Sequence, residues 1–132
     1  EGTPFDFRTP TVVGDRINDT TDVQIVNGTG YDHNWILNTP GDINKVFATI
    51  SDPTTGIVME MFTTEPGVQF YAGNFLDGSF IGKKGVAHPQ RSAFCFETQH
   101  YPDTPNQPSF PSTLVRPEDT YKTTTVYKFG VK

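Results

Sequence analysis

Glycine and proline interrupt this chain so often that a long helix has almost no room in it. The 132 residues include 12 Gly and 11 Pro, and both residue types destabilise the interior of a helix. They are dense in segments 74–91 and 101–117, which predict long irregular loops of the kind that often build binding sites. At most, a short helical turn is expected near residues 13–18. Helical bundles and coiled coils are excluded.

Side chains also alternate with a period of two, which is typical of β-strands. Residues 121–129 place Tyr, Thr and Phe side chains on one face, and we expect that face to be covered. Residues 45–51 and 56–63 alternate on either side of a turn that contains Pro and Gly, so they predict a β-hairpin. Further strands are predicted at residues 22–26, 31–38, 68–72 and 92–98. The predicted fold class is all-β.

The composition excludes several classes of protein and of partner. Aromatic residues make up 13% of the chain, whereas disordered segments carry few of them. The formal net charge is −5 and no basic stripe is present, so no nucleic-acid partner is expected. No helical apolar stretch reaches membrane-spanning length, so no membrane partner is expected either. Cys95 lies in the apolar run 93–96 and is expected to be a small buried side chain without a disulfide partner.

Three segments join a predicted strand to polar residues that a core would not select: 28–35, 67–74 and 94–103. The first contains Asp32 after a glycine-rich turn, and the third contains Glu97 after an aromatic-flanked apolar run. Aromatic surroundings can raise the pKa of a carboxyl group toward the working pH of an enzyme. A solvated surface charge is the ordinary alternative for a glutamate at a strand end.

Five ordered blocks of this sequence resemble the aldose 1-epimerase (galactose mutarotase) family. They are TPFDFR (3–8), GYDHNWIL (30–37), SDPTTGIVMEMFTTEPGVQFYAGNFLDG (51–78), FCFETQHYPDTPNQPSFPS (94–112) and TYKTTTVYKF (120–129). The resemblance implies an antiparallel β-sandwich of the galactose mutarotase type, the supersandwich, with a sugar bound in an open cleft. It also implies that residues 1–132 are the C-terminal part of a single domain whose N-terminal part is absent from this chain.

The resemblance assigns three site residues. Glu97 of the ETQ block matches the catalytic base, Asp32 of the GYDH block matches a carboxylate that binds sugar hydroxyls, and Gln69 of the GVQFY block matches an amide that reaches the sugar. The implied reaction interconverts the α and β anomers of hexoses such as galactose and glucose, without a cofactor. The family's acid is a histidine upstream of TPFDFR, and none of this chain's histidines matches it. The isolated chain is therefore expected to be inactive without an N-terminal part, present as a separate chain or a missing segment.

The remaining polar residues have ordinary interpretations. The spacing of Asp32, His33 and Asp103 fits no standard ligand pattern, so no metal is expected. His33 is expected to be structural, His100 either to anchor a loop or to line the cleft, and His88 to lie in a surface loop. The sequons at Asn18 and Asn27 are read as turn chemistry. The three histidines and the two sequons therefore point to no second site.

Two other functions remain open at this stage. One is a non-catalytic sugar-binding relative that keeps the sandwich without turnover. The other is a glycoside hydrolase on a similar sandwich, which would use Asp32 and Glu97 as its carboxylate pair. A cytoplasmic location is expected, with a periplasmic or secreted one left open.

Overall fold

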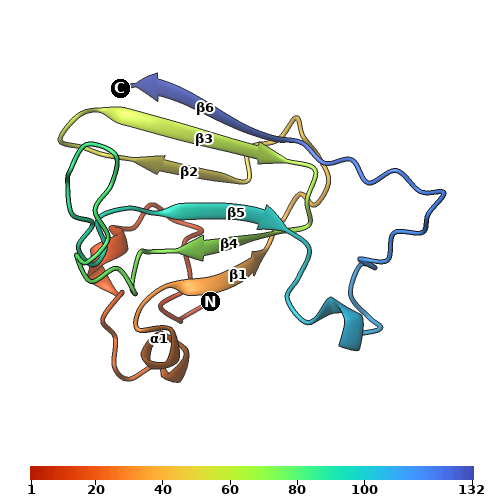
Figure 1. The fold of residues 1–132 in the computed structure, drawn as a ribbon, viewed down its shortest axis with the longest axis horizontal. Helices are drawn as coiled ribbons and strands as arrows, with labels where there is room; N and C mark the ends of the chain where they lie inside the picture. The colour runs from red at the N-terminus through yellow and green to blue at the C-terminus, as the bar shows by residue number, and fades with distance from the viewer. The chain divides into compact units, whose positions relative to one another are not determined.

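The computed structural model describes residues 1–132, and most of its regular structure is β (Figure 1). In chain order, the elements are η1 (Val13–Asp15), α1 (Val23–Gly28), β1 (Asp32–Ile36), β2 (Ala48–Ser51), β3 (Ile57–Thr63), β4 (Gly67–Tyr71), β5 (Cys95–Gln99), η2 (Thr104–Asn106) and β6 (Thr125–Val131). The predicted all-β class is confirmed, and η1 is the short turn predicted near residues 13–18.

One three-stranded sheet has the order β1-β4-β5, so β4 is its central strand. The arrows of neighbouring strands point in opposite directions in Figure 1, as in an antiparallel sheet. The backbone N–H of Ala72 donates to the carbonyl of Tyr31 (3.0 Å) at one end of the β1/β4 pair. The N–H of Leu37 donates to the carbonyl of Pro66 (3.1 Å) at the other end.

The other three-stranded sheet has the order β2-β3-β6. β2 and β3 form the predicted antiparallel hairpin, in which Ser51 is opposite Val58 and Ala48 is opposite Met61. β6 pairs antiparallel with the other edge of β3, from Thr63 opposite Thr125 to Ile57 opposite Val131. β3 is thus bonded on both sides, and its C-terminal end, with buried Met61 and Thr63, is the best covered part of this sheet.

The chain divides into two compact units. The first unit comprises Glu1–His33 and Gln69–Glu97, and the second comprises Asn34–Val68 and Thr98–Lys132.

The core of the first unit is built from aromatic rings. Tyr31 is fully buried and stacks on Phe70, with ring centroids 5.7 Å apart. Phe70 also stacks on Phe96, with centroids 4.8 Å apart and an interplanar angle of 9°. Offset stacking of this kind adds to the free energy gained from burying the rings. These contacts hold the strands β4 and β5 together on one face of their sheet.

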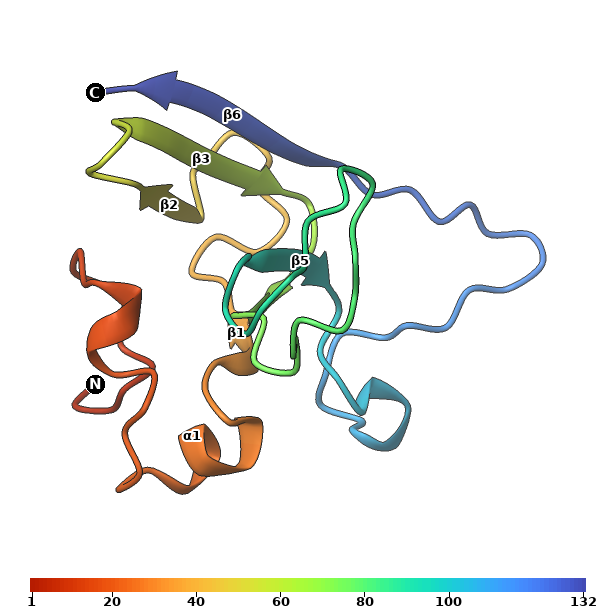
Figure 2. The ribbon, with the colours of Figure 1, turned by 60° about the vertical axis from the view of Figure 1, so that its left-hand side comes forward.

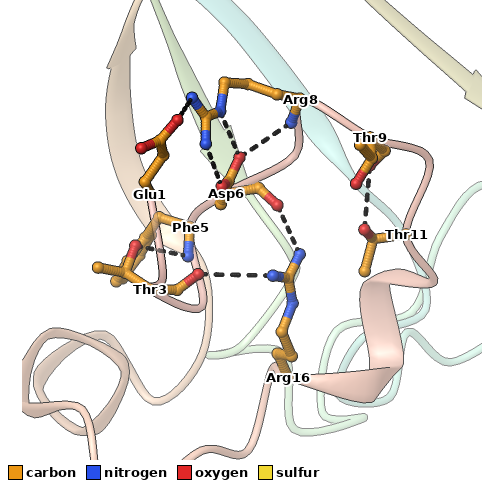
Figure 3. A network of polar contacts seen from close by, with 8 residues as sticks. All are labelled: Glu1, Thr3, Phe5, Asp6, Arg8, Thr9, Thr11 and Arg16. Carbon is orange, nitrogen blue, oxygen red and sulfur yellow. Dashed lines mark hydrogen bonds and ion pairs between the residues drawn. The ribbon is translucent and has the colours of Figure 1, made fainter.

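The TPFDFR block is held by charged and polar contacts close to this core (Figure 3). Arg8 forms ion pairs with Asp6 (2.7 Å) and Glu1, and Nη2 of Arg16 donates to the carbonyl of Asp6 (2.8 Å). The hydrogen bonds from Arg8 hold the pKa of Asp6 well below its usual range. The buried hydroxyl of Tyr31 donates to the carbonyl of Pro4 (3.0 Å), which joins the block to the aromatic core. This block therefore has a structural role.

The second unit contains a long excursion between β5 and β6, residues 100–124, which is drawn in blue in Figure 2. It holds only the single turn η2, as its prolines predict. The rings of Tyr101 and Phe110 meet edge to face, with centroids 5.3 Å apart. At the first residue of β6, where the excursion ends, the hydroxyls of Thr63 and Thr125 lie 3.0 Å apart and join β3 to β6.

The strand predicted at residues 22–26 is wrong, because these residues begin helix α1. Asp22 is its N-cap, and its carboxylate accepts hydrogen bonds from the N–H groups of Gln24 (2.8 Å) and Ile25 (3.3 Å). Thr29 ends the helix in a left-handed conformation. The alternation of apolar residues in so short a segment fits either structure, and the N-cap carboxylate favours the helix by about 1 kcal/mol. Only Ile25 of this helix is buried.

Two expectations about burial are also wrong. Cys95 is exposed, because it lies on the face of β5 opposite to Phe94 and Phe96, whose rings contact Phe70. β6 is exposed along its length, and Thr125 is its only partly buried residue. β6 has β3 as its sole neighbour in the sheet, and its aromatic side chains remain open to solvent.

Candidate active site

The pleat of the β1-β4-β5 sheet determines which side chains share a face. Because Phe70 stacks on Phe96, these two side chains lie on the same face of β4 and β5. Successive side chains of a strand point to opposite faces, so Gln69 and Glu97 both lie on the other face. Asp32 of β1 reaches this second face as well, since its carboxylate contacts Gln69. The three site residues assigned from the sequence therefore share one face.

Asp32 and Gln69 form the centre of this face. Nε2 of Gln69 donates a hydrogen bond to Oδ1 of Asp32 at 2.8 Å. This bond fixes the amide orientation, so Oε1 of Gln69 is left as a buried atom without a hydrogen-bond partner. A buried acceptor without a partner costs free energy in the empty site. It is therefore a candidate to accept a hydroxyl group of a ligand.

Glu97 is the third residue, and its side chain is exposed. Its neighbours Phe94 and Phe96 lie on the opposite face of β5, where both rings contact Phe70. The prediction that these flanking aromatic residues surround the carboxylate is therefore wrong, because strand alternation points them away from it. Glu97 is reachable from solvent, as a base that acts on a diffusing substrate has to be.

The other candidate residues lie elsewhere. The carboxylate of Asp103 accepts hydrogen bonds from Asn106 and Gln107 in its own turn. The ring of His88 stacks on Phe80 within the loop 74–91. Nδ1 of His100 lies 2.8 Å from the carboxylate of Glu65. The structure contains no group of three or more His, Cys, Asp or Glu side chains arranged to hold a metal ion, and no helix of membrane-spanning length and apolarity.

Sequence reasoning missed Glu65, a carboxylate with only 2% of its surface exposed. Burial raises its pKa, but hydrogen bonds from Thr123 and Tyr121 and the nearby His100 outweigh burial, so the pKa of Glu65 lies below its ordinary value. The only local signal is its position before Pro66, at the turn into β4, and such a glutamate is usually solvated.

Comparisons with known proteins match nearly the whole length of this chain. A family model described as aldose 1-epimerase matches residues 1–128. The galactose mutarotase of Homo sapiens is 46% identical over 132 residues, which are 99% of this chain and 36% of that protein. The aldose 1-epimerase of Escherichia coli (strain K12) is 33% identical over 130 residues, which are 97% of this chain and 37% of that protein.

A solved structure supports the fold. The GalM/aldose epimerase homologue from C. elegans matches 98% of this chain and 37% of its own with a TM-score of 0.76, at 24% sequence identity. The expected mutarotase-like β fold is thus confirmed. The chain spans only about a third of the length of the proteins it matches.

Proposed function

Since this chain belongs to the aldose 1-epimerase family, we propose that it supplies the base and part of the sugar-binding face of a mutarotase. The enzyme interconverts the α and β anomers of aldohexoses such as galactose and glucose. The observation that carries this proposal is the shared face of Asp32, Gln69 and Glu97, with Asp32 and Gln69 in direct hydrogen-bond contact.

Glu97 is the general base of this proposal. Its carboxylate takes the proton of the anomeric hydroxyl, the oxygen electrons form the C1 carbonyl, and the bond between C1 and the ring oxygen breaks. An acid protonates the ring oxygen as it leaves. Rotation about the C1–C2 bond and reversal of these steps give the other anomer. No metal or redox cofactor has a step in this sequence.

Asp32 and Gln69 bind sugar hydroxyls. Nε2 of Gln69 is occupied by Asp32, so Gln69 offers its unpartnered Oε1 as an acceptor. Oδ2 of Asp32, the oxygen that does not accept from Gln69, is the second acceptor of this proposal. Acceptors on two side chains in direct contact suit a pair of neighbouring hydroxyl groups, which monosaccharides carry.

The acid is proposed to come from another part of the epimerase fold. His33, His88 and His100 are each engaged with other groups in this chain. The chain covers 36% of human galactose mutarotase, so the relative has ample sequence to contribute an acid. The remaining part, as a segment of the same polypeptide or a second chain, is thus the proposed protein partner. A cytoplasmic location stays a prediction.

The test is the replacement Glu97→Gln in the assembled enzyme, followed by polarimetry of freshly dissolved α-galactose. Loss of the base with retention of shape is expected to lower kcat by about 100-fold or more while sugar still binds. The exposed residue Thr49→Ser, on β2 of the other sheet, is the control and retains kcat. Unchanged turnover in Glu97→Gln would show that Glu97 is not the base. Sugar binding without turnover in the unsubstituted enzyme would identify a non-catalytic relative.

A further inference from the structure

We infer that His33 is a positioning residue for Asp32, because its neutral imidazole fixes the backbone of Asp32 to helix α1. This inference rests on the proposed role of Asp32 in sugar binding. Nδ1 of His33 accepts a hydrogen bond from the backbone N–H of Asp32 at 3.0 Å. The histidine therefore acts on the sugar through its neighbour and does not take part in the proton transfers.

The N–H of Asp32 has no strand partner in this chain. β1 is an edge strand whose neighbour in the sheet is β4. The carbonyl of Tyr31 faces β4, where it accepts from Ala72. In an antiparallel pair, the polar groups of successive residues point alternately toward and away from the partner strand. The N–H of Asp32 therefore points away from β4, and the imidazole supplies the acceptor that a further strand would otherwise give.

The imidazole packs against two neighbours. The ring of Phe5 meets it edge to face, with centroids 4.7 Å apart and an interplanar angle of 69°. The ring also lies against Gly28, the last residue of α1, where an added Cβ would be only 2.9 Å from Cε1 of His33. The contact with α1 thus depends on the absence of a side chain at Gly28.

The hydrogen bond from Asp32 also determines the tautomer. A backbone N–H only donates, so Nδ1 carries no proton and the proton of the neutral ring is on Nε2. The backbone of Gln24 in α1 forms the second hydrogen bond of this ring. Since Nδ1 is occupied as an acceptor, Nε2 is the atom that donates to it. His33 thereby links the first turn of α1 to the start of β1.

The surroundings keep the ring neutral. Burial lowers the pKa of His33, and this effect outweighs the charges of Asp32 and Asp22 and the hydrogen bond with Gln24, all of which raise it. Asp32 lies on the histidine's own strand and Asp22 caps the packed helix, while Phe5 carries no charge. At a pH low enough to protonate Nδ1, the ring loses its acceptor, and Asp32 loses its anchor next to Gln69.

Kinetics of a matched pair of variants in the assembled enzyme test this role. His33→Phe keeps a ring of similar size but removes the acceptor, whereas His33→Asn keeps an oxygen at the position of Nδ1. We expect His33→Phe to raise KM for galactose roughly fivefold to tenfold with kcat within about threefold, as for loss of one hydrogen bond. His33→Asn is expected to restore KM to within about twofold of the original. Equal KM values for all three proteins would overturn the inference.

A double-mutant cycle separates positioning from general destabilisation. If His33 acts through Asp32, His33→Phe adds little to the KM of an Asp32→Asn enzyme. If the two effects multiply, the histidine acts by another route and the inference fails. An Asp32→Asn enzyme with unchanged KM would contradict the proposed sugar contact of Asp32, and only the spectroscopic test below would then apply to His33.

Nuclear magnetic resonance tests the anchor without any sugar. In the folded enzyme at neutral pH, nitrogen shifts of His33 are expected to show a proton on Nε2 and none on Nδ1. The amide proton of Asp32 is expected to exchange slowly, and to exchange at least tenfold faster in His33→Phe but not in His33→Asn. A ring protonated on Nδ1, or fast exchange at Asp32 in the unsubstituted enzyme, would refute the hydrogen bond. If His33→Phe does not fold, the tautomer and exchange measurements on the unsubstituted enzyme decide the question.

Discussion

Nδ1 of His100 lies 2.8 Å from Oε2 of Glu65, inside the second unit. The other oxygen of the same carboxylate, Oε1, accepts a hydrogen bond from the hydroxyl of Tyr121 at 2.6 Å. His100 begins the excursion 100–124 and Tyr121 lies near its end, so one buried carboxylate holds both ends of a segment with little regular structure of its own. The contact with Glu65 raises the pKa of the Tyr121 hydroxyl.

We predict that Glu65→Ala lowers the free energy of unfolding by about 2 kcal/mol, because it removes the buried carboxylate that accepts from the hydroxyl of Tyr121 and pairs with the partly buried His100. Glu60, whose carboxylate pairs with Lys128 at 3.0 Å on the surface, is the matched control. Glu60→Ala is expected to cost about 1 kcal/mol or less, since exposed ion pairs contribute little. Urea unfolding of the assembled enzyme measures both, and equal losses would contradict the anchoring role of Glu65.

Stability should also depend on Glu65 in acid. The folded pKa of this group lies below its ordinary value of 4.5, so folding favours the ionised form. The stabilisation is fully present above the unfolded pKa and is lost as the pH falls through the folded pKa. Between those two values, the unsubstituted protein is expected to lose more stability than Glu65→Gln, in urea unfolding at a series of pH values. Parallel curves would show that Glu65 contributes nothing to the acid response.

Gln69→Leu should weaken sugar binding more than catalysis. The change removes the hydrogen bond to Asp32 and the unpartnered acceptor Oε1. We expect KM for galactose to rise roughly tenfold, as for about 1.4 kcal/mol of lost hydrogen bonding. Gln107→Leu is the control and should leave KM unchanged. It removes only the side-chain hydrogen bond from Gln107 to Asp103, the two residues that flank η2. Initial-rate polarimetry gives both values, and a fall in kcat alone would argue against a binding role for Gln69.

Gly73 follows β4 with a φ of +69°, and a Cβ there would lie 2.9 Å from the carbonyl oxygen of Ala93. Gly73→Ala therefore combines left-handed strain with a clash against backbone, and we expect it to destabilise the protein by about 2 kcal/mol. Gly14→Ala is the control, because no atom lies within 4 Å of an added Cβ. A thermal melt that shifts equally for the two variants would contradict this account.

The strands and the family were predictable because both depend on short stretches of sequence. The alternation in residues 45–63 is enough to form the β2–β3 hairpin, which has the predicted turn and an antiparallel register. The assignment of Asp32, Gln69 and Glu97 came from the family resemblance, and the pleat then explains why alternate positions on β4 and β5 place the last two on one face. The strand predicted at residues 22–26 was wrong because a few apolar residues fit the period of a strand and the period of a helix equally well. The capping hydrogen bonds of Asp22 favour the helix.

The sequence by itself determined the strand periodicity, the loop-rich connections and the membership of the aldose 1-epimerase family, all of which are properties of local pattern. Only the tertiary structure decided which polar groups meet. Glu65 lies far along the chain from both His100 and Tyr121, yet all three converge at hydrogen-bond distance. Likewise, His33 became an anchor only because Asp32 lies on an edge strand beside helix α1. Charge, burial and tautomer depend on neighbours in space, and chain order alone does not specify those neighbours.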